Sequence, residues 1–87
     1  MPDEFYITIS HGKAFRLKIK KILLSDDMEI YQVRARNKTF AVQSDRPLLR
    51  TRGIKNQEPT WILNAGLISS TEVFDKVCAA IMEIVDQ

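Results

Sequence analysis

The chain contains one cysteine, one histidine, and only three glycines and three prolines among its 87 residues. A single cysteine excludes a disulfide-stabilised secreted scaffold and favours a reducing compartment. Isolated glycines exclude a glycine-rich phosphate loop, and one histidine without a cysteine pair excludes the usual zinc motifs. We therefore expect no metal, no other cofactor and no catalytic residues.

Long apolar stretches are also missing. Runs such as Cys78 to Met82 fall far short of the roughly 18 residues that a membrane-spanning helix needs. The acidic start, Met1 to Glu4, lacks the basic residues and the apolar stretch of a secretory signal. We expect a cytoplasmic protein that has no membrane contact.

The composition is that of a folded protein. Apolar residues make up 45% of the chain and charged residues 28%, which argues against disorder. A chain of this length can sustain one hydrophobic core and is too short for two. Residues 1–87 are therefore expected to form one domain.

Most of the first half of the chain alternates between apolar and polar residues, which is typical of half-buried β-strands. Four segments follow this pattern: residues 5–10, 14–24, 29–36 and 39–44. Residues 45–66 are interrupted by prolines and glycines and are expected to be mostly loop. Within them, residues 60–64 form either a fifth strand or part of that loop, and Trp61 has to be buried.

Turn lengths follow from keeping one apolar face across the sheet, because a slip of one residue would turn the wrong side chains inward. Loops over residues 11–13 and 25–27 and a two-residue turn at 37–38 satisfy this condition. The resulting pairs are Ile7 with Leu17, Ile19 with Val33, and Val33 with Val42. The sequence thus predicts an antiparallel meander of four or five strands.

The C-terminal segment predicts an amphipathic helix from about Ser70 to Val85. Ser69 and Glu72 have the spacing of a capping box at its start. At 100° per residue its apolar side chains share one arc and its acids the other. The fold class is therefore α+β, with the sheet packed on one C-terminal α-helix.

Charge is unevenly distributed along the chain, although the net charge is only +2. Residues 1–12 and 56–87 are acidic, whereas residues 13–55 carry twelve bases and four acids. Such asymmetry can mark a polyanion partner or pairing between charged surfaces.

The predicted register gathers the bases on the sheet face that points away from the helix. Arg16 lies opposite Arg36, and Lys18 opposite Arg34. Like charges in such positions destabilise a sheet, so a neutralising partner is expected, either in residues 45–66 or outside the chain. The polyanion-binding candidates are Tyr6, Arg16, Lys18, Lys20, Arg34, Arg36, Arg46, Arg50 and Arg52.

Two functions agree with this pattern. The first is a small non-enzymatic binding module whose basic sheet face takes a polyanion, with nucleic acid as the favoured case. The alternative is a homo-oligomeric or adaptor domain that binds an acidic protein surface or a second copy and no nucleic acid. Only Tyr6 among the aromatics points outward, so a stacking platform for bases is not indicated. No small-molecule substrate is expected.

The remaining reactive side chains have simple structural explanations. His11 lies beside Gly12 in a predicted turn, where a solvated residue is expected. Cys78 lies at the margin of the apolar arc of the helix, and nearby acids disfavour its thiolate, so we expect a buried structural residue.

Overall fold

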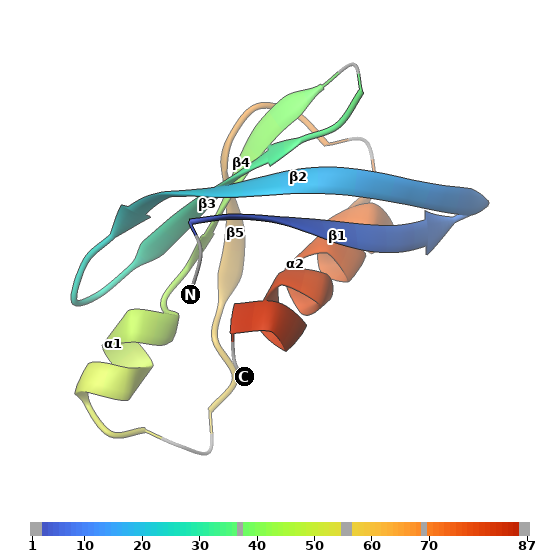
Figure 1. Cartoon of the computed structure of the whole chain (residues 1–87). Coiled ribbons are helices and arrows are strands. Elements are labelled where there is room, and N and C mark those ends of the chain that lie inside the picture. The colour runs from blue at the N-terminus through green and yellow to red at the C-terminus, as the bar shows by residue number, and fades with distance from the viewer. Residues whose placement is uncertain (1–2, 37, 55–56, 69, 86–87) are drawn as a thin grey trace.

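The computed structural model describes residues 3–36, 38–54, 57–68 and 70–85, and it has the predicted α+β fold (Figure 1). Five antiparallel strands form one sheet in the order β1-β2-β3-β4-β5, with a C-terminal helix across one face. In chain order the elements are β1 (Glu4–His11), β2 (Lys13–Leu24), β3 (Glu29–Arg34), β4 (Thr39–Ser44), α1 (Arg46–Thr51), β5 (Trp61–Ala65) and α2 (Thr71–Val85).

The first two predicted registers are confirmed where the strands pair regularly. Ile7 lies opposite Leu17, and Ile19 lies opposite Val33. Near its end β2 contains an irregularity between Lys21 and Leu23 that shifts the pairing with β3 by one residue. This irregularity was not predicted. A short apolar patch, formed by Ile22, Leu23 and Leu24, is exposed at the same end of β2.

The predicted register between β3 and β4 is wrong by two residues. Val33 lies opposite Phe40 rather than Val42, and β3 ends at Arg34. The N–H of Ala35 donates to the carbonyl of Lys38 at 2.8 Å, which places the turn earlier than predicted. A two-residue shift keeps the same side chains on the core face, so the apolar pattern could not distinguish the two registers.

Helix α2 packs its apolar stripe on the inner face of the sheet, as predicted. Val77 and Ile81 are fully buried among strand residues of the core such as Ile19 and Val33. The predicted capping residue Ser69 lies outside the described residues. The cap that the structure shows is Ser70, whose Oγ accepts a hydrogen bond from the N–H of Val73 at 3.4 Å.

The described residues between 45 and 66 contain more regular structure than the predicted loop. They contain the short helix α1, in whose first turn Pro47 lies, and the fifth strand. The carboxylate of Asp45 accepts a hydrogen bond from the N–H of Thr60 at 2.7 Å, which holds the two ends of the segment between these residues together. The chain then enters β5, which pairs with β4 from Trp61 onward.

None of the helices in the described part of the chain is long and apolar enough to cross a membrane.

Candidate functional site

The sheet face opposite α2 carries the predicted cluster of bases. We define the basic face by Arg16, Lys18 and Lys20 of β2 and Arg34 of β3. Lys18 lies directly opposite Arg34, as predicted, and Lys20 lies opposite Gln32. None of the described helices covers this face (Figure 1), so its cations remain open to solvent.

A hollow of about 80 Å³ lies at the centre of the basic face. Lys18, Lys20 and Arg34 line it together with Gln32 and a single carboxylate, Glu4. The carboxylate of Glu4 lies 3.4 Å from the ammonium of Lys18. This neutralising contact was not predicted, and it comes from β1 rather than from residues 45–66. One exposed acid leaves the hollow with an excess of positive charge.

Tyr6 adds an aromatic ring to the basic face. The guanidinium carbon of Arg16 lies 4.2 Å from the centre of the Tyr6 ring, in a cation–π arrangement. Tyr6 is 52% exposed. The exposed Tyr6 ring and the Arg16 guanidinium therefore lie together on the basic face, and Tyr6 lies directly opposite Lys18 of the hollow.

Arg36 does not lie opposite Arg16 as predicted, because β3 ends two residues earlier. It lines an apolar hollow of about 320 Å³ together with Phe15 and Phe40, whose side chains belong to the inner face. The expected position on the basic face assumed that β3 continues to Arg36, whereas the strand ends at Arg34.

The three arginines of residues 45–66 do not extend the basic face either. Arg50 and Arg52 are exposed at α1, and Arg50 lines a hollow with Met82 of α2, on the opposite side of the sheet. Arg46 is only 11% exposed and forms an ion pair with the fully buried Glu29. Its guanidinium is engaged in the core and is not available to a polyanion.

The buried network around Arg46 also includes Tyr31. The hydroxyl of Tyr31 donates to a carboxylate oxygen of Glu29 at 3.0 Å. Burial, followed by the neighbouring negative charge of Glu29, raises the pKa of Tyr31 to about 12. The hydrogen bond with Glu29 raises the pKa of Arg46. Tyr31 and Arg46 therefore keep their protons at neutral pH, and the hydrogen bonds to Glu29 join β3 to α1.

His11 and Cys78 lie apart from each other. The imidazole Nδ1 of His11 is 3.8 Å from the exposed carboxylate of Glu72, at the tip of the β1–β2 hairpin. Cys78 is buried, as predicted, and burial together with Asp75 raises the pKa of its thiol to about 12. A protonated, buried thiol is a poor nucleophile. Within the described residues, no three His, Cys, Asp or Glu side chains gather as metal ligands would.

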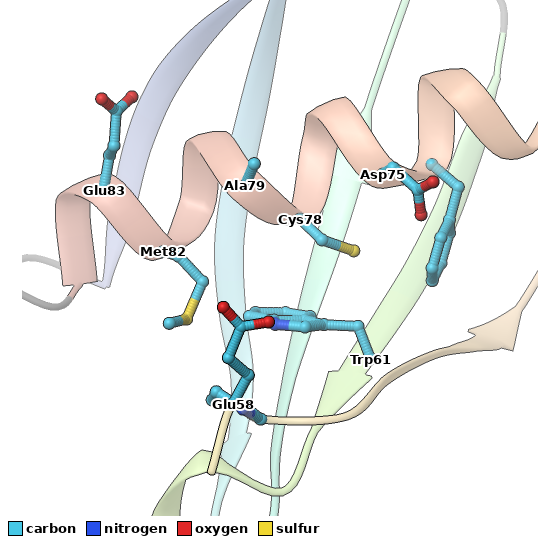
Figure 2. Close-up of a pocket in the computed structure, with 9 residues that line it drawn as sticks. Glu58, Trp61, Asp75, Cys78, Ala79, Met82 and Glu83 are labelled. Atoms are coloured by element: carbon cyan, nitrogen blue, oxygen red, sulfur yellow. The ribbon is translucent and has the colours of Figure 1, made fainter. Parts of the chain in front are cut away.

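A second candidate site, a groove between β5 and α2, was missed by the sequence analysis (Figure 2). It encloses about 660 Å³ and lies on the α2 side of the sheet, opposite the basic face. The only signal in the sequence was Trp61, which was expected to be buried. Its partial exposure in an edge strand depends on the path of residues 45–66, which the sequence did not predict.

Comparison with known protein families, curated proteins and solved structures gave no match, so function has to be inferred from the geometry of this chain.

Proposed function

We propose that the protein is a small non-enzymatic binding module whose basic face binds a phosphate-bearing polyanion, with single-stranded nucleic acid as the favoured partner. The hollow between Lys18, Lys20 and Arg34 is the observation that carries this proposal. Its volume of about 80 Å³ suits a single phosphate group, and its cations outnumber its one carboxylate. Lysine and arginine side chains in such an arrangement supply sequence-independent affinity for a phosphate backbone.

The cation–π pair of Tyr6 and Arg16 favours a single strand over a duplex. Unpaired bases can stack on an aromatic ring or on a guanidinium plane, whereas paired bases in a helix cannot. With only one aromatic ring on the basic face, stacking adds little base discrimination. We therefore expect only slight sequence preference.

A purely binding role is supported by the state of the reactive side chains. The thiol of Cys78 is buried and its pKa is raised, and His11 has an acid rather than a nucleophile beside it. We further propose that the protein acts in the cytoplasm, since its one cysteine is a free thiol that a reducing compartment would preserve.

The proposal is tested by fluorescence anisotropy with a labelled oligothymidylate of about 20 nucleotides, titrated at several salt concentrations. If the four cations of the basic face contact phosphates, the log–log plot of affinity against salt should have a slope of about −3. A matched duplex should bind more weakly. Absence of binding at low salt would contradict the proposal.

Self-association is a second candidate, favoured by the opposite charges on the two sides of the molecule. The outward side of α2 carries Glu72, Asp75 and Glu83, whereas the other side of the sheet is basic. The exposed patch of Ile22, Leu23 and Leu24 could add apolar contact. Contacts between unlike faces generate closed rings or open filaments, and the assembled fraction grows with concentration. Sedimentation at low and high salt distinguishes this candidate, since a protein that remains a monomer at low salt excludes it.

A further inference from the structure

The groove between β5 and α2 has an apolar floor made from two elements. Phe74, Cys78 and Met82 follow one another at four-residue spacing and form a single stripe along α2. Trp61 of β5 lies across from them, and Figure 2 shows Cys78 and Met82 pointing from the helix toward the strand side of the groove. The Trp61 ring also packs near Tyr31, with 6.2 Å between ring centres, which fixes its position.

The groove continues along the free edge of β5. A neighbouring hollow of about 330 Å³ shares Trp61 and Phe74 with it and is also lined by Ile62 and Leu63. Consecutive residues of a strand point to opposite faces, so a hollow that touches both must reach the edge of the strand. Ile62 is 49% exposed.

This edge is open to a further strand. β5 is the last strand of the sheet and pairs with β4 on one side only, among the residues that the structure describes. Its five residues, Trp61–Ala65, include no charged residue and no proline, two of the usual protections of an exposed edge. Unpaired backbone groups next to an apolar groove are the features that bind extended peptides by strand addition.

The rim of the groove is acidic. Glu58, Asp75 and Glu83 line it and are exposed, and none of the described lining residues is a lysine, arginine or histidine. An occupant with positive charges at both ends of an apolar segment would therefore be complementary to the groove.

We propose that this groove binds an extended segment of a partner protein, with apolar side chains flanked by lysine or arginine, which adds to β5 as a sixth strand. The site is distinct from the basic face and lies on the other side of the sheet. The apolar side chains enter between Trp61 and the helix stripe, and the flanking cations pair with the acidic rim. The proposal does not depend on polyanion binding.

A second copy of the chain is a poorer occupant of the same edge. Pairing two β5 strands around a twofold axis perpendicular to the sheet would place both α2 helices on the same side. The acids of each rim would then approach those of the other copy, and like charges at close range oppose such an interface.

The test uses a labelled peptide, Lys-Thr-Val-Thr-Leu-Thr-Lys, whose lysines, valine and leucine share one face of an extended strand. Binding is followed by anisotropy and by amide chemical shifts of the protein. We expect saturable binding with shifts in β5 and α2, and loss of binding when both lysines are replaced by glutamate. Equal binding of the glutamate peptide, or shifts confined to the basic face, would overturn the proposal.

Strand addition itself is tested with two N-methylated forms of the peptide, one methylated at the three threonines and the other at valine and leucine. Backbone N–H groups of alternate residues point to opposite edges of a strand, so one form should lose binding and the other should retain it. If both forms bind like the parent peptide, no strand is added and the proposal is wrong. This comparison requires no change to the protein.

Charge reversal at the rim independently tests whether the acids of the groove bind the lysines of the peptide. The double variant Glu58→Lys/Asp75→Lys should bind the lysine peptide about tenfold more weakly or worse. Its matched control, Asp3→Lys/Asp26→Lys, makes the same charge change at exposed positions outside the groove and should bind normally. An equal loss of peptide affinity in both variants would contradict the site.

A dimer of the wild type that Ile62→Lys dissociates would show that a second copy is the occupant, and would also overturn the proposal.

Discussion

The guanidinium of Arg46 holds the carboxylate of Glu29 in two parallel hydrogen bonds, with Nε 2.8 Å from Oε1 and Nη2 3.0 Å from Oε2. The two residues are 17 positions apart in the sequence, and Glu29 is fully buried. The same guanidinium donates to the carbonyl of Val85 in the last turn of α2 at 3.4 Å. One side chain thus connects α1, β3 and the C-terminal end of α2.

Breaking this pair from one side should be far more damaging than removing it altogether. Glu29→Leu leaves the Arg46 charge largely buried without its partner and should lower the free energy of unfolding by about 3–5 kcal/mol. The double variant Glu29→Leu/Arg46→Met should recover much of that loss. Urea denaturation of the wild type, both single variants and the double variant measures the coupling. If the double variant loses as much free energy of unfolding as the two single variants together, the two residues are not coupled and this prediction is wrong.

The free energy of unfolding should fall at alkaline pH because of two buried groups, the thiol of Cys78 and the phenol of Tyr31. The folded-state pKa of Cys78 is about 12 against 9.0 for the free group, and that of Tyr31 is about 12 against 10.0. Because both folded pKa values are raised, the unfolded chain loses these protons first. The stabilisation is complete below about pH 9 and falls as pH rises from there toward 12.

Cys78→Ala should therefore flatten the first part of this decline, between about pH 9 and 10, while Tyr31 still lowers stability above it. At neutral pH the substitution should cost only about 1–2 kcal/mol. Urea denaturation in a reducing buffer at a series of pH values provides the measurement. Parallel pH profiles for the variant and the wild type would show that the thiol does not titrate as inferred.

Gly66 should tolerate substitution less well than Gly53. Its φ is +85°, and a Cβ at this position would lie 2.9 Å from the backbone Cα of Phe40, where β4 and the end of β5 approach closely. Gly53 also has a positive φ, +69°, but a Cβ there meets nothing within 4 Å. Gly53→Ala should cost about 1 kcal/mol, from backbone strain alone.

Gly66→Ala should cost clearly more than Gly53→Ala, because the strand backbone has to move as well. Thermal denaturation of the two variants side by side gives the comparison. Similar melting temperatures would mean that the close approach to Phe40 is not a constraint.

Local patterns predicted the fold well because they act over short distances. Burial is predicted directly by the alternation that places Ile7 and Ile9 on one face of β1, and by the apolar arc around Val77 in α2. The turn lengths then follow, because the apolar faces of neighbouring strands have to match. The β3–β4 register could not be predicted from the apolar pattern, because a shift of two residues leaves Val33 on the same face of the sheet. The α1 helix is six residues long and was not predicted, because the prolines and glycines of residues 45–66 indicated a loop.

The candidate sites were only partly predictable. Lys18 and Arg34 share a face through regular strand pairing, so their positions followed from periodicity. Arg46 and Glu29 meet only through tertiary structure, and a charged residue in an irregular segment gives no sign that it will be buried. The groove at Trp61 depends in the same way on the path that brings β5 beside β4.

Arg34→Glu shows whether the basic face is a binding surface. This change removes one cation from the hollow and places a carboxylate opposite Lys18. Arg50→Glu is the matched control, since it makes the same charge change at an exposed position of α1 on the other side of the sheet. For both variants, affinity for the labelled oligothymidylate and thermal stability are measured on the same samples.

We expect Arg34→Glu to weaken binding at least about tenfold while leaving the melting temperature unchanged or raised, because an opposite-charge cross-strand pair replaces a like-charge pair. Arg50→Glu should bind within about twofold of the wild type, because a distant surface charge is largely screened. If Arg34→Glu binds as tightly as Arg50→Glu, the basic face is only solvated surface and the proposed function is wrong.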